Sequence, residues 1–216
     1  MNDIGENRAQ PLWVVKIGGS LEQAQELRPW LNVLAQAGAG RVVVVAGGGR
    51  FADAVREAQA RWQFDDAAAH KMAILAMEQY GCLLAALEPR LAPAATLPAI
   101  NQRLGEGRAV LWQPSLMTLA DPDAGIPADW QMTSDSLAAW LAGRLGGPQL
   151  ALVKSVAPPG VGVRCEQAIA RGVVDARLRR ILLDHQVSAC WLGRSDHARF
   201  TAILDGSSRP LTPLLT

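Results

Sequence analysis

Two apolar runs that end in consecutive glycines constrain the fold of this 216-residue chain more than any other feature. Residues 12–17 (LWVVKI) precede Gly18 and Gly19, and residues 41–46 (RVVVVA) precede Gly47, Gly48 and Gly49. A short, nearly unbroken apolar run is typical of a strand that is buried on both faces, as in a parallel sheet. Each glycine turn leads into a helical pattern, so the chain repeats the order strand, glycine turn, helix.

The rest of the sequence continues this alternation. Further strands are expected at 109–112, 150–153 and 188–192, and helices at 20–38 (capped by Ser20 and divided by Pro29), 50–62, 66–87, 133–145 and around 174–184. The alternation predicts an α/β fold, a three-layer α/β/α sandwich with a mainly parallel central sheet. In such a sheet the ligand binds beyond the carboxyl ends of the strands.

Composition argues against several classes of partner. The net charge of +1 leaves no large field to attract nucleic acid or a membrane, so a small molecule is the expected partner. Residues 1–10, which we expect to be flexible, lack the apolar core of a signal peptide, and no apolar run approaches membrane-spanning length. Cys82, Cys165 and Cys190 form no C-x-x-C pair, and we expect buried thiols in a reducing compartment, the cytoplasm. The three histidines are scattered, so no transition-metal site is expected.

The two glycine turns predict an anion site. Amide groups at the starts of two helices can point into one crevice, and glycine lets a phosphate approach the backbone closely. The 21 basic residues include only three lysines, and Lys16 stands two residues before the first glycine pair. A compact ammonium suits a tight phosphate site. Ordinary tight turns are the alternative explanation.

Two other glycine motifs fit less well. The P-loop pattern G-x-x-x-x-G-K-[ST] is absent. Gly47, Gly49 and Ala52 satisfy a relaxed dinucleotide pattern, which leaves a dinucleotide-dependent oxidoreductase as an open alternative. In that pattern an acidic residue ends a second strand about 20 positions later, whereas Asp65 and Asp66 begin a helix.

The segments VVKIGGSL, VVVVAGGGRFADAVR and WQMTSDSLAAWLA resemble the three ordered signatures of the amino acid kinase superfamily. The fragments HKMAI, WQMTSDS and GRSDHAR resemble the branch that phosphorylates an aminomethyl-furanmethanol phosphate in methanofuran biosynthesis. The resemblance implies one kinase domain over residues 11–216, with an acceptor-binding half at about 11–130 and a nucleotide-binding half at about 131–216. It also implies ATP with Mg²⁺, a small phosphate acceptor, and a homodimer or higher homo-oligomer.

Site residues follow from the same resemblance. The catalytic residues implied are Lys16, Asp135 and Lys154. The ATP-binding residues implied are Lys16, Gly18, Gly19, Ser20, Lys154, Ser155, Gly160 and Arg194. The acceptor-binding residues implied are Gly47, Gly48, Gly49, Phe51, Trp130, Thr133 and Ser134. Asp135 would orient the lysines and the magnesium shell, or it would cap its helix.

The chain departs from the superfamily at residues 154–160 (KSVAPPG), where relatives carry a Thr-Asp-Val-Asp-Gly run. Lys154 would supply a second phosphate-binding lysine, or it would be a lysine at a strand end. The altered loop keeps a second function open, a non-catalytic nucleotide- or oxyanion-binding member of the same fold. The helix at 66–87 places Met72, Leu75, Ala76 and Cys82 near one stripe, which indicates core or a subunit interface.

Overall fold

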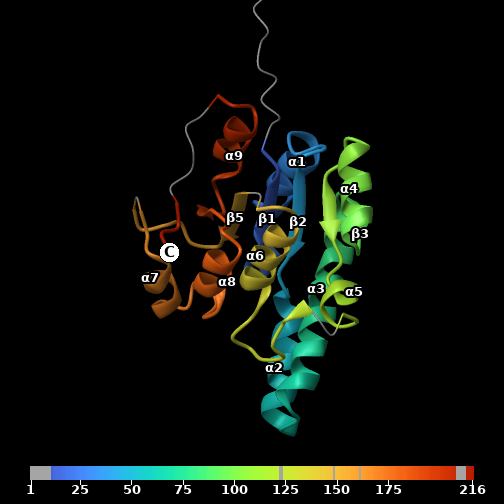
Figure 1. The fold of residues 1–216 in the computed structure, drawn as a ribbon, viewed down its shortest axis with the longest axis vertical. Coiled ribbons are helices and arrows are strands. Elements are labelled where there is room, and N and C mark those ends of the chain that lie inside the picture. The colour runs from blue at the N-terminus through green and yellow to red at the C-terminus, as the bar shows by residue number, and fades with distance from the viewer. Residues whose placement is uncertain (1–10, 122–123, 148, 161, 208–212) are drawn as a thin grey trace, which may run out of the picture.

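The computed structural model describes residues 11–121, 124–147, 149–160, 162–207 and 213–216. Within these residues, six parallel strands form one sheet in the order β3-β4-β2-β1-β5-β6. The strands are β1 Trp13–Ile17, β2 Val42–Ala46, β3 Ala92–Ala94, β4 Val110–Trp112, β5 Gln149–Lys154 and β6 Ala189–Gly193. The helices are η1 Gly19–Leu21, α1 Leu27–Gln36, α2 Gly49–Trp62, α3 Asp66–Leu87, α4 Leu97–Gly105, α5 Ser115–Thr118, α6 Ser134–Arg144, α7 Cys165–Ala170, α8 Leu178–Asp184 and α9 His197–Leu204. The three-layer α/β prediction is confirmed (Figure 1). Residues 1–10, which were expected to be flexible, lie outside the described residues.

Alternate residues of each strand face two separate hydrophobic cores. Val14 of β1 and Leu152 of β5 belong to the core that contains α6 and α8, whereas Val15 and Val153 belong to the core that contains α1 and α9. This period of two follows from the pleat of a strand. It places the side chain of Lys16 on the same face of the sheet as Val14, toward α6.

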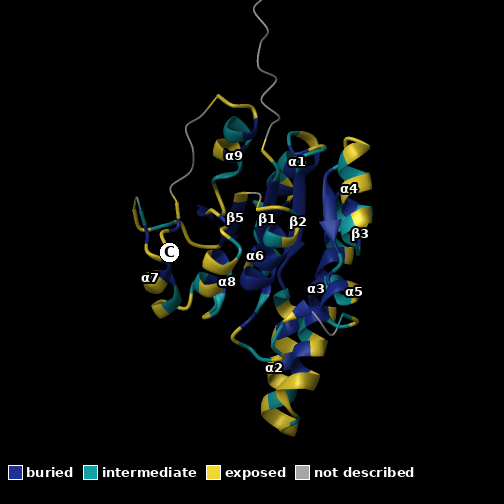
Figure 2. Cartoon of the chain, in the orientation of Figure 1, coloured by how far each residue is buried: buried dark blue, intermediate teal, exposed yellow. Residues whose placement is uncertain are grey.

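Helices α2 and α3 pack side by side and extend past the sheet, at the lower end of the view in Figure 1. Figure 2 shows that the outer end of this pair is largely exposed. The bounds of α3 match the predicted 66–87. The residues of the predicted apolar stripe differ in burial, because Ala76 is buried while Met72 and Leu75 are each 40% exposed.

Several sequence expectations need correction. The expected helix at 20–38 is only η1 followed by α1, and Ser20 caps neither. Pro29 is the third residue of α1, in the first turn, where its missing N–H leaves no helical hydrogen bond unmade. Cys82 is exposed and was expected to be buried, whereas the other two cysteines are buried. Among the described helices, none combines the length and apolar character that crossing a bilayer requires.

Four elements, β3, α4, α5 and α7, were not expected from the sequence. The strand β3 (APA) contains Pro93, which is tolerated because β3 lies at the edge of the sheet. The helix α4 does carry a start signal, since the Thr96 hydroxyl accepts a hydrogen bond from the Ala99 N–H at 3.3 Å and Pro98 lies in the first turn.

Candidate active site

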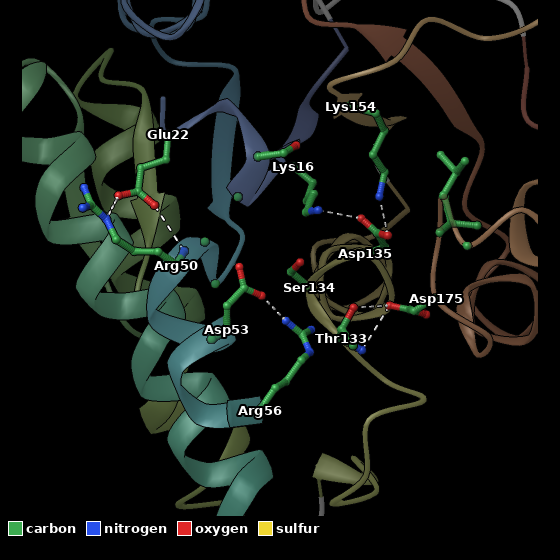
Figure 3. A pocket seen from close by; sticks show the side chains of 18 of the residues that line it. Lys16, Glu22, Arg50, Asp53, Arg56, Thr133, Ser134, Asp135, Lys154 and Asp175 are labelled. Atoms are coloured by element: carbon green, nitrogen blue, oxygen red, sulfur yellow. Dashed lines mark hydrogen bonds and ion pairs between the residues drawn. The ribbon is translucent and has the colours of Figure 1, made fainter. Parts of the chain in front are cut away.

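Two buried lysines on neighbouring strands meet one buried aspartate at the carboxyl ends of the strands. The ammonium Nζ of Lys16, on β1, lies 2.9 Å from Oδ1 of Asp135, and Nζ of Lys154, on β5, lies 2.5 Å from Oδ2. Asp135 is the second residue of α6, and the N-terminus of α6 reaches the strand ends (Figure 3). The three predicted catalytic residues are therefore brought together, although their roles stay predictions.

The charges of this cluster do not balance, because two ammonium groups share one carboxylate. Burial alone would raise the pKa of Asp135, but the Lys16 and Lys154 ammonium groups outweigh it and lower that pKa to about 2. Burial lowers the pKa of Lys154 to about 8, and the Lys16 charge acts in the same direction, against the opposing attraction of Asp135. The cluster therefore keeps an excess of positive charge that a bound anion can neutralise.

A cavity of about 540 Å³ opens over this cluster. Its charged lining residues are Lys16, Glu22, Arg50, Asp53, Arg56, Asp135, Lys154 and Asp175. A second cavity of about 270 Å³ lies over Gly18, Ser155 and Val156, and it shares Lys16, Lys154, Gly19, Ser20, Gly172 and Val173 with the first. The volume of the larger cavity suits a small-molecule ligand. The two cavities meet at the lysines, so two ligands can approach each other there.

The two glycine turns touch backbone to backbone. A Cβ on Gly19 would lie 2.3 Å from the amide nitrogen of Gly49, and a Cβ on Gly47 would lie 2.7 Å from the amide nitrogen of Gly19. These approaches leave no room for a side chain, and the φ of Gly49 is +54°. The glycines are therefore required for packing the two turns together as well as for opening the crevice.

Of the six residues whose amides were predicted to bind phosphate, four line the larger cavity, Gly19, Ser20, Gly48 and Gly49. The other two are engaged inside the protein. The N–H of Gly18 donates to Val153 O at 3.1 Å, and the N–H of Gly47 donates to Ile17 O at 2.8 Å. The expectation that these two amides hold phosphate is therefore corrected.

The carboxylate of Glu22 occupies the N-terminus of α2, where the sequence predicts an acceptor phosphate. Its Oε2 accepts a hydrogen bond from the Arg50 N–H at 3.2 Å, and its Oε1 pairs with the Arg50 guanidinium (Figure 3). The Glu22 side chain is only 4% exposed. An internal carboxylate thus satisfies a helix start that would otherwise favour an external anion.

Asp175 caps α6 from a distant segment. Its Oδ2 accepts from the Thr133 N–H and the Ser136 N–H at 3.0 and 2.9 Å and from the Thr133 hydroxyl at 3.0 Å, and its Oδ1 accepts from the Ser136 hydroxyl. Burial and the charge of Asp135 raise the pKa of Asp175, and these hydrogen bonds offset the effect only in part. The sequence leaves the cap of this helix open among Thr133, Ser134 and Asp135. Thr133 is the N-cap residue, but its side chain makes no cap bond.

The remaining predicted site residues divide into two groups. Ser155 lines the 270 Å³ cavity, Thr133 and Ser134 line the 540 Å³ cavity, and Trp130 lines a third, smaller cavity beside it. Phe51 packs against a hydrophobic core, and Gly160 and Arg194 lie outside the described lining of all three cavities. Arg194 pairs instead with Glu26, at 3.3 Å between Nε and Oε1.

Two side chains of α2 that line the 540 Å³ cavity were not predicted from the sequence. Asp53 and Arg56 are paired at 2.7 Å, and the Arg56 guanidinium lies 4.7 Å from the ring centroid of Trp130. Asp53 and Arg56 lie four and seven residues after Gly49, which places all three on one face of a helix. The pattern G-x-x-x-D-x-x-R could therefore have indicated that these two side chains lie near the glycine turn. Glu22 and Asp175 had no such signal, because tertiary folding alone brings them to the site.

The described residues contain no cluster of three or more His, Cys, Asp or Glu side chains that could hold a metal ion.

Comparison with known proteins adds a family and a fold. A model described as the amino acid kinase family matches residues 11–158. A [5-(aminomethyl)furan-3-yl]methyl phosphate kinase from Methanocaldococcus jannaschii is 30% identical over 129 residues, which cover 59% of this chain and 58% of that protein. The chain thus spans less than two thirds of that relative's length.

Solved structures show the same fold at low sequence identity. The uridylate kinase of Archaeoglobus fulgidus superposes with a TM-score of 0.68 at 16% identity, over 94% of this chain and 98% of that chain. The UMP kinase of Ureaplasma parvum gives 0.69 at 13% identity, over 92% and 96%. The relatives and fold neighbours are kinases.

Proposed function

This chain belongs to the amino acid kinase family, and from that premise we propose that it transfers the γ-phosphoryl group of ATP to a small phosphate monoester. The observation that carries the proposal is the meeting of the two cavities at Lys16 and Lys154, with Asp135 between the two ammonium groups. Phosphoryl transfer depends on alignment and charge stabilisation more than on covalent catalysis, and this cluster provides both. We place the reaction in the cytoplasm, where ATP is available.

In the proposed reaction an oxygen of the acceptor phosphate attacks the γ-phosphorus of ATP. A new P–O–P bond forms, the bond from the γ-phosphorus to the β,γ-bridging oxygen breaks, and the products are ADP and a diphosphate ester. No proton needs to be removed, because a phosphate monoester is already an anionic nucleophile. The problem is repulsion between two polyanions, which Lys16 and Lys154 reduce from the strand ends.

The residues present fit ATP phosphates with Mg²⁺, since amides and two ammonium groups border the junction of the cavities. When bound with ATP, Mg²⁺ supplies further neutralisation of the phosphate oxygens. Both oxygens of Asp135 face ammonium groups, and Asp175 bonds to Thr133 and Ser136. We therefore propose that Asp135 orients the lysines, and that Mg²⁺ arrives with the nucleotide.

For the acceptor, we propose a phosphate ester of the kind named for the Methanocaldococcus relative, with an aminomethyl group on a small ring. The phosphate would lie in the 540 Å³ cavity near Gly48, Lys16 and Arg56, and the nucleotide would lie over Gly18 to Ser20 and Ser155. This division assigns residues 11–130 mainly to the acceptor and residues 131–216 mainly to the nucleotide.

The direct test is ³¹P NMR of the wild-type protein with ATP, Mg²⁺ and [5-(aminomethyl)furan-3-yl]methyl phosphate. We expect the acceptor singlet to be replaced by the two coupled signals of a diphosphate ester, with equal formation of ADP. A panel of other phosphate esters, UMP included, serves as the control for acceptor choice. Absence of transfer to every ester would reject the kinase.

A second function is favoured by one observation, the Glu22 carboxylate at the start of α2. A site already filled by an internal anion suits a protein that binds a nucleotide or oxyanion without transferring phosphate. Calorimetry that shows ATP binding, combined with the absence of transfer in the NMR assay, would select this function.

We also propose that the chain forms a homodimer or larger homo-oligomer through α3, where Met72, Leu75 and Cys82 are exposed. Sedimentation of the wild type and of a Met72→Glu, Leu75→Glu variant tests this assembly. Identical monomeric behaviour of both proteins would reject it.

A further inference from the structure

A small cavity of about 60 Å³ adjoins the 540 Å³ cavity beside Gly48. Both cavities are bordered by Gly48, Ala52, Arg56, Thr133 and Ser134, so they share one wall. The rest of the small cavity is mainly apolar, with Ala73, Ile74, Met77, Met132 and Leu137 in its lining. Its volume is about that of two water molecules in the liquid, so it suits a compact chemical group.

One polar side chain in this cavity lacks a partner. His70 is 6% exposed, and its Nε2 is buried with no hydrogen-bond partner among the described residues. The ring makes a hydrogen bond to the backbone of Asp129 that raises the His70 pKa, as donation by a ring N–H does, although the larger effect of burial lowers it. With Nδ1–H donating to that backbone, Nε2 presents a lone pair. A buried polar atom without a partner in a native protein requires an explanation.

The acceptor atoms of the small cavity lie apart from the cation that borders both cavities. Arg56 borders both cavities, whereas His70 and Asp129 border the small cavity and not the large one. Trp130 also borders the small cavity, and the Arg56 guanidinium already lies 4.7 Å from its ring centroid. A cationic side chain thus lies where the cavities join. On the His70 side, Asp129 is already paired with Arg177 at 2.7 Å, so the acceptor without a partner among the described residues is Nε2 of His70. This arrangement complements a molecule with a phosphate at one end and an amine at the other.

We propose that His70 selects the acceptor, its Nε2 accepting a hydrogen bond from an amino group that enters the small cavity. The inference rests on the proposed function for the placement of the acceptor phosphate beside Arg56. The acceptor class is then a small amine-bearing phosphate monoester. His70 is a specificity-determining residue with no part in the transfer itself.

The test uses phosphate-free probes, so it needs neither ATP nor turnover. The chain has three histidines, and their Cε1–H signals are monitored by ¹H–¹³C NMR at pH 7 during titration with furan-2-ylmethanamine or with 2-methylfuran, which lacks the amino group. We expect the amine to move the His70 signal and to bind at least about tenfold more tightly than 2-methylfuran, because a site built for a hydrogen bond discriminates against a ligand that lacks the donor.

Three variants separate recognition from packing. His70→Phe fills the space without an acceptor atom and should reduce the preference for the amine to less than about twofold, whereas His70→Gln offers an amide oxygen and should keep part of the preference. Met77→Leu changes the same cavity without touching the hydrogen bond, and it should weaken both probes alike. An unmoved His70 signal, or an unchanged preference in His70→Phe, would overturn the inference.

The outcome is independent of the kinase assay. A protein that prefers the amine through His70 but transfers no phosphate would reject the kinase and retain amine recognition. A protein that phosphorylates the aminomethyl ester and its desamino analogue with equal kcat/KM would retain the kinase and overturn the role of His70.

Discussion

Two aspartates beside the N-terminus of α6 show how the same carboxylate chemistry serves two purposes. Asp135 lies within α6 and contacts the ammonium groups of Lys16 and Lys154. Asp175 comes from the segment between α7 and α8, and its side chain accepts hydrogen bonds from hydroxyl and amide groups of Thr133 and Ser136. The pKa of Asp135 is lowered to about 2, whereas the pKa of Asp175 is raised.

The chemical nature of the partner decides the charge state of each buried carboxyl. Burial raises the pKa of both carboxyls, but only Asp135 has cations close enough to outweigh burial. Asp135 therefore anchors the charges of the proposed reaction, while Asp175 acts as a helix cap that holds the N-terminus of α6 in place. Four predictions test this contrast.

The largest effect is expected for Asp135→Asn, which leaves Lys16 and Lys154 without an anion between them. Removing one partner from a buried charge cluster costs roughly 3–5 kcal/mol, so we expect a loss of that size in the free energy of unfolding, measured by urea denaturation at pH 7. Inorganic phosphate should restore part of the loss by occupying the lysines. Asp53→Asn, which breaks an exposed pair with Arg56, is the control and should cost less than about 1 kcal/mol. Equal losses in the two variants would contradict the special status of Asp135.

The wild-type pH dependence provides the sign of this effect. Because the folded pKa of Asp135 is lowered to about 2, its contribution to stability is present above the unfolded pKa of about 3.9. It is lost as the pH falls toward 2. The difference in stability between wild type and Asp135→Asn should therefore shrink below about pH 4.

The second prediction concerns Lys16→Met, which should fold because a balanced pair of Asp135 and Lys154 remains. Loss of one charge-stabilising group costs roughly a hundredfold to a thousandfold in kcat, so we expect a decrease of that size in the ³¹P assay. Lys71→Met is the matched control, since Lys71 is an exposed lysine on α3, and its activity should equal that of the wild type. Similar activity in both variants would remove Lys16 from the proposed mechanism.

Some of this contrast was predictable from the sequence. Lys16 is the only polar residue of the strand WVVKI, and the glycine turn after it marks the carboxyl end of a buried strand. The hydroxyl and acidic residues at 133–136 indicate a helix start, and helix starts of an α/β fold that carry polar side chains commonly border the ligand crevice at the strand ends. The helix start alone indicates a cap, and the pairing of Asp135 with the lysines was implied by the resemblance to the amino acid kinase superfamily.

The missing parts are non-local. Asp175 lies 42 residues from Thr133 and Glu22 lies 28 residues from Arg50, so neither contact follows from a local pattern. The cap of α6 and the anion at the start of α2 depend on how separate segments fold together. The edge strand β3 was missed for another reason, since its alanines and proline carry no strand preference of their own.

The third prediction concerns the pH dependence of activity and a smaller effect. Burial lowers the pKa of Lys154 to about 8, so the free protein loses this ammonium charge as the pH rises through that value. We expect kcat/KM to fall about tenfold per pH unit well above pH 8, because kcat/KM reports groups of the free enzyme. Lys154→Arg keeps its charge at all accessible pH values and should remove this decline. A decline that persists in Lys154→Arg would belong to another group.

The smallest effect is expected for Asp175→Asn. The raised pKa means that the charge of Asp175 is disfavoured in the folded protein, and the amide oxygen of Asn can still accept hydrogen bonds from Thr133 and Ser136. The contribution of the wild-type carboxyl to stability is present below its unfolded pKa and is lost as the pH rises through its folded pKa. In urea denaturation at pH 7 we therefore expect the stability of the variant to lie within about 1 kcal/mol of that of the wild type. The variant should gain stability relative to the wild type as the pH rises above the unfolded pKa of about 3.9. Asp175→Ala, which removes the cap altogether, should cost about 1–2 kcal/mol. If Asp175→Asn instead matched the loss in Asp135→Asn, the charge of Asp175 would be as important as that of Asp135, and the distinction between a charge anchor and a helix cap would fail.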